Sequence, residues 1–206
     1  MGILRKVYLY IFFLLILIDI SCWPTRDLKN FTLYGETTEV DTNKLKINGV
    51  YYTLQKSENK SRVKCFVLYE NGTYLDLTSC EINSNIESAI DSLISNFNAH
   101  QKMYSTEYIS IWGAFKIMED TLLIQRYHSS IMPKPGIITF TSKVFNYKMK
   151  ILNDTTLIEG SVDDESKSIF EEYYLFKTNR KPDSTNLFMT NKRVKRKLDK
   201  LNEKRK

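Results

Sequence analysis

Glycine and proline are scarce in this chain of 206 residues, which holds seven glycines and four prolines. This composition excludes a collagen-like or linker-rich protein. Apolar residues make up 42% of the sequence and aromatic residues 13%, which is enough to fill a core and excludes wholesale disorder. The length fits one folded domain together with additional terminal segments.

Residues that carry catalysis are also rare. His100 and His128 are the only two histidines, and no further His or Cys stands at the spacing of a zinc site. The sequence contains neither a Gly-rich phosphate loop nor the Gly-x-Ser-x-Gly turn of hydrolases. We therefore expect no enzymatic activity, no bound metal and no cofactor.

Positive charge is concentrated in a short C-terminal tail, residues 191–206. The net charge of the chain is +6. Outside the tail and the first 21 residues the chain is slightly negative, so we expect no binding of nucleic acid. The basic residues of the tail are Lys192, Arg193, Lys195, Arg196, Lys197, Lys200, Lys204, Arg205 and Lys206.

The same tail carries Val194, Leu198 and Leu201 at the spacing of one helix face. A helix here would have a narrow apolar stripe in a cationic surrounding. Such a helix suits contact with anionic lipid or with a protein partner. The alternative is a solvated, disordered terminus.

The first 21 residues have the pattern of an export signal. Arg5 and Lys6 precede an apolar run over residues 7–18, which is short for a bilayer core of about 30 Å. We expect a signal peptide over residues 1–21; an uncleaved anchor helix is the alternative. The polar stretch 22–45, which lacks periodicity, is expected to be a tether ahead of the folded domain.

The end of this signal resembles that of bacterial lipoproteins, in which a small residue precedes a cysteine. Here the pair is Ser21-Cys22. The resemblance implies that Cys22 is acylated and holds the chain on a membrane. It places the protein in a bacterial envelope, lipid-anchored, on the outer membrane and facing the periplasm. Ordinary cleavage and a secreted product form the alternative.

Between residues 46 and 190, turn signals separate short runs of alternating or apolar residues. This pattern is typical of sequential β-hairpins. Residues 84–98 have helical spacing instead, with Ser84 as the expected cap and Glu87 three residues later. The expected strands cover residues 46–55, 62–70, 73–79, 108–118, 121–128, 137–152, 155–160 and 170–177.

Two hairpins allow a prediction of register. A two-residue loop at Asn71-Gly72 sets Leu68 opposite Leu75 and Phe66 opposite Leu77. In the same frame Cys65 and Cys80 are diagonal neighbours on one face, where they either form a disulfide or remain separate thiols. A turn at Glu119-Asp120 sets the following residues opposite each other: Ile117 and Leu122, and Phe115 and Ile124.

Eight sequential strands with one inserted helix predict an antiparallel meander that forms a barrel or a strongly curved sheet. Aromatic residues on the strands have two interpretations. Trp112, Tyr127, Tyr69 and Tyr74 would line a site for a small apolar ligand, or they serve packing alone.

Several short segments resemble small envelope lipoproteins of Bacteroidota-type bacteria, which are commonly described as lipocalin-like. The segments are residues 45–52, 68–74, 112–117, 120–125 and 181–188. The resemblance implies a lipocalin-like barrel and carries over no ligand residue. We expect a membrane-anchored, non-enzymatic module that binds a small apolar ligand. The alternative is a structural or assembly lipoprotein that contacts an envelope partner through its surface or its basic tail.

Overall fold

The structure is a computed structural model that describes residues 28–34, 43–57, 60–101, 111–134, 137–160, 170–186 and 190–204. The expected signal peptide and Cys22 lie outside these residues.

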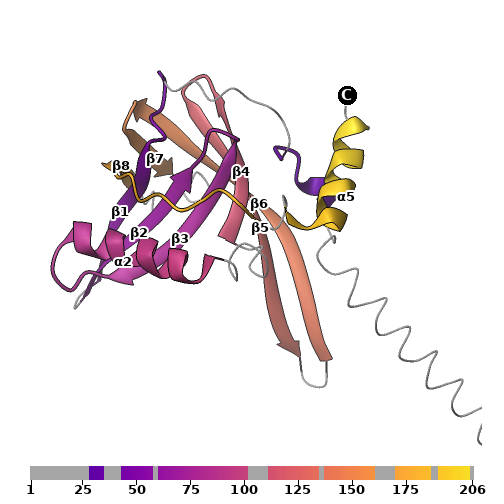
Figure 1. Cartoon of the computed structure of the whole chain (residues 1–206), viewed down its shortest axis with the longest axis horizontal. Coiled ribbons are helices and arrows are strands. Elements are labelled where there is room, and N and C mark those ends of the chain that lie inside the picture. The colour runs from indigo at the N-terminus through magenta and orange to yellow at the C-terminus, as the bar shows by residue number, and fades with distance from the viewer. Residues whose placement is uncertain are drawn as a thin grey trace, which may run out of the picture.

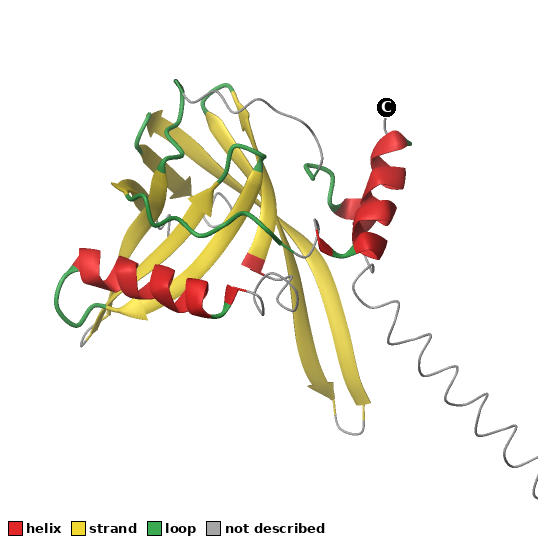
Figure 2. Cartoon of the chain, viewed as in Figure 1, coloured by secondary structure: helices red, strands yellow, loops and turns green. Residues whose placement is uncertain are grey.

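The chain forms a closed antiparallel barrel of eight strands in sequential order, with the last strand paired to the first. This confirms the mainly β fold predicted from the hairpin pattern, and Figures 1 and 2 show the strands together with the helices. The elements are η2 (Leu28–Asn30), β1 (Gly49–Ser57), β2 (Lys60–Leu68), β3 (Thr73–Glu81), α2 (Ile86–Ala99), β4 (Trp112–Met118), β5 (Thr121–Lys134), β6 (Ile137–Asn153), β7 (Thr156–Gly160), β8 (Phe170–Lys177) and α5 (Lys192–Glu203).

The register of the β2–β3 hairpin differs from the prediction. Leu68 lies opposite Tyr74, and Phe66 opposite Asp76. The loop has three residues instead of two: the Tyr69 amide donates to the Thr73 carbonyl, and Gly72 adopts a φ of +76° while Asn71 does not take a positive φ, which the two-residue turn requires. In the β4–β5 hairpin, by contrast, both predicted pairs are confirmed.

The inserted helix α2 is present, but its cap differs from the prediction. Asn85, not Ser84, is the N-cap, and its side chain accepts a hydrogen bond from the Ser88 amide at 2.8 Å. The helix lies across β2 and β3, as Figure 1 shows. Its buried residues, Ala89, Ile90, Ile94 and Phe97, form the apolar stripe that the helical spacing predicted.

Two separate apolar cores result from the alternation of side chains along the strands. One core draws a side chain from each of the eight strands, which is possible only inside the barrel. Its buried members are Leu45, Ile47, Tyr51, Phe66, Leu68, Tyr74, Phe115, Leu122, Ile124, Met149, Leu157 and Tyr173. The other core lies between the outer barrel surface and α2, η2 and α5.

Both ends of the chain contribute to the outer core. Leu28 and Phe31 come from the stretch that we expected to be a tether, and Val194 and Leu198 come from the basic tail. All four side chains are fully buried. The tail is helical over Lys192–Glu203, and Figure 1 shows α5 beside η2. Among the described residues, no helix combines the length and apolar character needed to cross a membrane.

Candidate functional site

The four aromatic residues expected to line a ligand site are divided between the two cores. Trp112, Tyr127 and Tyr69 belong to the outer core, and Tyr74 lies inside the barrel. Each is at most 7% exposed. Tyr69 and Trp112 pack with ring centroids 6.4 Å apart, and Phe97 of α2 meets the edge of Trp112. These contacts account for the aromatic residues as packing.

Cys65 and Cys80 both pack into the outer core near α2, where they are separate thiols. Cys65 lies opposite Thr78, as the diagonal placement predicted. Burial raises the pKa of the Cys65 thiol, with a smaller contribution from neighbouring Cys80. The Cys80 Sγ approaches the Ala89 carbonyl oxygen of α2 at 3.5 Å. In this arrangement both cysteines support the position of the helix.

The barrel closes at the junction of β1 and β8, which we call the seam. Four residue pairs form its closed half, from Gly49 opposite Lys177 to Tyr52 opposite Tyr174. Gly49 permits this close approach, because a Cβ there would lie 2.2 Å from the Phe176 carbonyl oxygen. The Tyr51 hydroxyl donates to the Lys46 carbonyl oxygen at 2.6 Å and holds the chain that leads into the seam.

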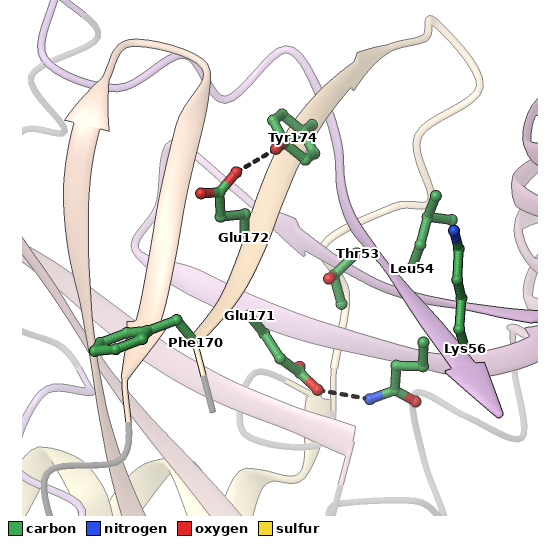
Figure 3. Close-up of a pocket in the computed structure, with 8 residues that line it drawn as sticks. Thr53, Leu54, Lys56, Phe170, Glu171, Glu172 and Tyr174 are labelled. Atoms are coloured by element: carbon green, nitrogen blue, oxygen red, sulfur yellow. Dashed lines mark hydrogen bonds between the residues drawn. The ribbon is translucent and has the colours of Figure 1, made fainter. Parts of the chain in front are cut away.

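Beyond Tyr52 the pairing of β1 with β8 stops, although both strands continue. We call this part, Thr53 to Ser57 with Phe170 to Tyr173, the open half of the seam. A groove of about 560 Å³ lies here, and Figure 3 shows the side chains between the two strands. Its lining residues are Thr53, Leu54, Gln55, Lys56, Phe170, Glu171, Glu172 and Tyr174.

Side chains bridge the open half where backbone pairing is absent. Gln55 would lie opposite Glu171 if the register continued. Instead, the Gln55 Nε2 donates to the Glu171 Oε1 at 2.9 Å, as drawn in Figure 3. The two strands are therefore connected across the groove through side chains, and no backbone pairing joins them there.

Exposed apolar side chains gather at this groove. The described residues include six large apolar side chains that are markedly exposed, and three of them line the groove: Leu54, Phe170 and Tyr174. Phe170 is the most exposed of the six, at 63%. Apolar side chains concentrated around a polar groove are characteristic of interaction surfaces.

Glu171, which lines the groove, belongs to a network of charged side chains on the inner side of the barrel wall. Glu159 of β7 and Glu171 of β8 are directly opposite each other, an unfavourable pair of like charges. The Lys64 ammonium lies between them, 3.7 Å from the Glu159 Oε2 and 3.5 Å from the Glu171 Oε2. The Tyr173 hydroxyl is 2.9 Å from each of the same two oxygens. The cation and the hydroxyl thus hold the two carboxylates together.

The network shifts the acidity of its members in opposite directions. Burial raises the pKa of Glu171, but hydrogen bonds from Gln55 and Tyr173 and the charge of Lys64 outweigh it, so that the pKa lies below its usual value. Burial and the neighbouring carboxylates raise the pKa of Tyr173. Glu171 is therefore ionised and Tyr173 is a neutral donor at physiological pH.

A second ion pair connects two other strands of the barrel. Arg126 of β5 pairs with Asp76 of β3, and its guanidinium lies 5.8 Å from the ring centroid of Tyr147. Asp76 also accepts a hydrogen bond from the Thr78 amide at 2.8 Å, where Thr78 adopts a φ of +66°. This ion pair makes the interior polar at the barrel end that also holds Lys64 and Glu171. Apolar residues fill the interior at the other end.

The groove offers fixed charges, hydrogen-bonding groups and exposed apolar side chains. General acid catalysis by a carboxyl requires a raised pKa, and Glu171 has a lowered one. No group of three or more His, Cys, Asp or Glu side chains within the described residues could hold a metal ion. Fixed carboxylates, an apolar rim and two strand edges are instead suited to contact with a polypeptide.

The sequence patterns did not predict this site, although the sequence contains one signal for it. Lys64, Glu159 and Glu171 occupy inward-facing positions, on the same faces as Phe66, Leu157 and Tyr173. Charged residues at inward positions of three strands indicate a polar barrel end. Their mutual contact, however, depends on the closure of β8 onto β1.

Comparisons with known proteins give no relative for this chain: no family model, no curated protein and no solved structure matches it.

Proposed function

We propose that this chain is an exported, lipid-anchored, non-enzymatic protein of a bacterial envelope that binds an extended segment of a partner protein at the open half of the seam. The observation that carries the proposal is the end of β1–β8 pairing at Tyr52, where a groove with an apolar rim begins. The export pattern and Ser21-Cys22 support the anchoring.

Strand addition suits this groove for a physical reason. A strand edge presents a row of amide and carbonyl groups that an added strand can pair with. Main-chain hydrogen bonds then supply affinity, and alternate side chains supply specificity. Leu54, Phe170 and Tyr174 would contact the apolar side chains of the segment, while Glu172 and Lys56 would contact its polar ones.

A partner segment is favoured over a small apolar ligand inside the barrel. Twelve buried apolar side chains occupy the described interior, and among them Tyr51, Phe66 and Tyr173 pack ring against ring. The aromatic residues first considered as ligand-lining belong to the two cores. These contacts support the second of the two functions expected from the sequence, contact with an envelope partner.

The anchoring is tested by the intact mass of the protein extracted from membranes. We expect a mature chain that begins at Cys22 and carries added acyl mass. A chain that begins elsewhere and carries no acyl group would refute the anchoring.

Binding is tested with a displayed library of extended eight-residue peptides. Peptides enriched on the full protein should protect the amides of β1 and β8 along the open half from hydrogen exchange. The double variant Gln55→Cys, Glu171→Cys supplies the contrast, because these positions would be opposed if the seam closed. Oxidation should draw the two strands together and abolish binding, and reduction should restore it.

The apolar rim offers a second test that does not depend on a new disulfide. Leu54→Ser, Phe170→Ser and Tyr174→Ser should together remove peptide binding. The control changes the other three exposed apolar residues, Met118, Phe145 and Leu152, to Ser and should leave binding intact. Equal binding by both triple variants would overturn the seam site. A small molecule that co-purifies with the oxidised form would favour a ligand inside the barrel instead.

A further inference from the structure

The basic tail and the N-terminal segment form one unit on the barrel. Val194 and Leu198 of α5 pack with Leu28 and Phe31, and the Asn202 side chain donates to the Tyr34 carbonyl oxygen at 2.8 Å. The apolar stripe of α5 is therefore covered by the chain's own N-terminal segment.

Besides the apolar contacts of the outer core, one buried side chain bonds this unit to the outer barrel surface. The Gln125 Oε1 of β5 accepts from the Leu33 amide at 2.8 Å, and its Nε2 donates to Thr32 at 3.0 Å and to Asn146 at 2.9 Å. Gln125 is 8% exposed. Because these bonds fix residues 32 and 33 on β5, the position of α5 relative to the barrel is fixed as well.

The remaining surface of α5 is strongly cationic. Five of its exposed side chains, together with Lys204 directly after the helix, are basic, and two, Asp199 and Glu203, are acidic. The basic ones are Lys192, Lys195, Arg196, Lys197, Lys200 and Lys204. The chain between the expected signal and the tail is slightly negative in sum, whereas this helix face gathers positive charge.

Cys22 stands only six residues before Leu28. Six residues span at most about 22 Å when fully extended. A lipid at Cys22 would therefore keep Leu28, and the helix packed on it, within a short distance of the membrane surface. An α-helix with its side chains is about 10 Å wide, so the basic face can reach the headgroups.

We infer that the basic face of α5 (Lys192, Lys195, Arg196 and Lys200) binds the anionic headgroups of the membrane that anchors the chain; this rests on the proposed lipid attachment at Cys22. Acyl chains and a basic surface together give the two attachments that stable membrane binding requires. Attraction of Lys and Arg to an anionic surface acts within about one Debye length, which the short connection to Leu28 satisfies. The helix thereby orients the barrel on the membrane.

The test uses the full chain on vesicles of phosphatidylcholine, with or without phosphatidylglycerol. Amine acetylation read by peptide mass spectrometry measures the exposure of each lysine. We expect labelling of Lys197 and Lys204 to be about fivefold slower on the anionic vesicles and to recover at high salt, because salt screens the attraction. Lys56 and Lys177, exposed on the barrel, should be labelled equally on both.

A variant and its matched control separate this contact from general charge. Lys192→Gln, Lys195→Gln, Arg196→Gln and Lys200→Gln should together abolish the protection. The control removes the same charge from exposed barrel positions, through Lys56→Gln, Lys148→Gln, Lys150→Gln and Lys177→Gln, and should retain it.

Fast labelling of the wild-type tail on both vesicles would overturn the inference, since no lipid would then cover the tail. Slow labelling on both would overturn it too, since a protein surface would then cover the tail. The intact mass of the same sample measures the acyl group independently of lysine labelling. A missing anchor is therefore distinguishable from a tail that does not contact lipid.

Discussion

The two halves of the seam consist of the same two strands, but different contacts hold the strands together in each half. In the closed half, backbones pair directly from Gly49 to Tyr52. In the open half, side chains such as Gln55 and Glu171 make the connection across a groove. The difference follows from what each half places inside the barrel. Apolar residues allow the strands to approach, whereas Glu171 and its partners form a polar, partly exposed end.

A barrel can therefore be closed in topology and still present free strand edges over part of its length. Full closure would remove the edges that make β-proteins prone to pairing with other chains. Here the closed half fixes the register, and the open half retains an edge on each side. Four substitutions test this contrast, with Tyr174→Phe as a matched control for one of them, and the expected effects of the four decrease in the order below.

Gly49→Val should have the largest effect, because it destroys the closed half. The new side chain would meet the Phe176 carbonyl oxygen, which lies only 2.2 Å from the position of a Cβ. We expect a loss of about 4 kcal/mol in the free energy of unfolding, measured by urea denaturation. An unchanged midpoint would show that the strands do not approach closely at Gly49.

The substitution Lys181→Met should also destabilise the closed half of the seam. The Lys181 Nζ donates to the Ile47 carbonyl oxygen at 2.6 Å and to that of Leu68, and it lies 4.6 Å from the ring centroid of Tyr69. Removing it leaves two carbonyls without this donor, at a cost of about 3 kcal/mol in urea unfolding.

This substitution also has a pH signature. Burial lowers the pKa of Lys181 from 10.5 to about 8. Between these values the unfolded chain binds more protons than the folded one, so the contribution of Lys181 to stability rises with pH. The difference between wild type and Lys181→Met should grow from pH 8 to pH 10.5. A difference that is constant over this range would contradict the burial of the ammonium.

Adjacent tyrosines of β8 offer a matched comparison within the open half. Tyr173 is fully buried and bonded to two glutamates, whereas Tyr174 is 45% exposed. Tyr173→Phe should cost about 1.5 kcal/mol, because it removes a hydrogen bond to a charged group. Tyr174→Phe should change stability by less than about 0.5 kcal/mol. Equal effects in thermal unfolding would mean that the network does not stabilise this half.

Apart from the Tyr174→Phe control, Lys64→Met should have the smallest effect at neutral pH, about 1 kcal/mol, because the ammonium is partly exposed. The lowered pKa of Glu171 means that its stabilising contribution is present above the unfolded value near 4.5 and is lost as the pH falls through the folded value. The difference between wild type and Lys64→Met should therefore shrink from pH 5 to pH 3 in urea unfolding. A difference that persists at pH 3 would assign the role of Lys64 to packing.

Local pattern was sufficient to predict much of the fold. The alternation along the strands predicted eight strands, and β8 has the predicted bounds. The Glu119-Asp120 turn predicted the register of β4 with β5 correctly. The Asn71-Gly72 turn did not, because Gly72 takes a positive φ but Asn71 does not, whereas the two-residue turn requires it at both. Such turns differ by one residue, and only the surrounding strands select between them.

The candidate site was not predicted, because its parts are distant in the sequence. Lys64 and Glu171 are 107 residues apart, and only barrel closure brings them together. The aromatic residues on the strands drew the prediction towards a ligand site elsewhere, although strands favour such residues for packing alone. Exposure of Leu54, Phe170 and Tyr174 at one groove could not be read from their spacing.

The sequence by itself determined the elements: the alternating strands, the inserted helix and the amphipathic pattern of α5, all set by neighbours within a few residues. The export signal and the acylation of Cys22 remain predictions from the same kind of pattern. Only the tertiary structure decided that β8 pairs with half of β1, that Glu159 faces Glu171, and that α5 packs on Leu28. These contacts depend on closing long loops of chain, and short-range preferences carry no information about which ends will meet.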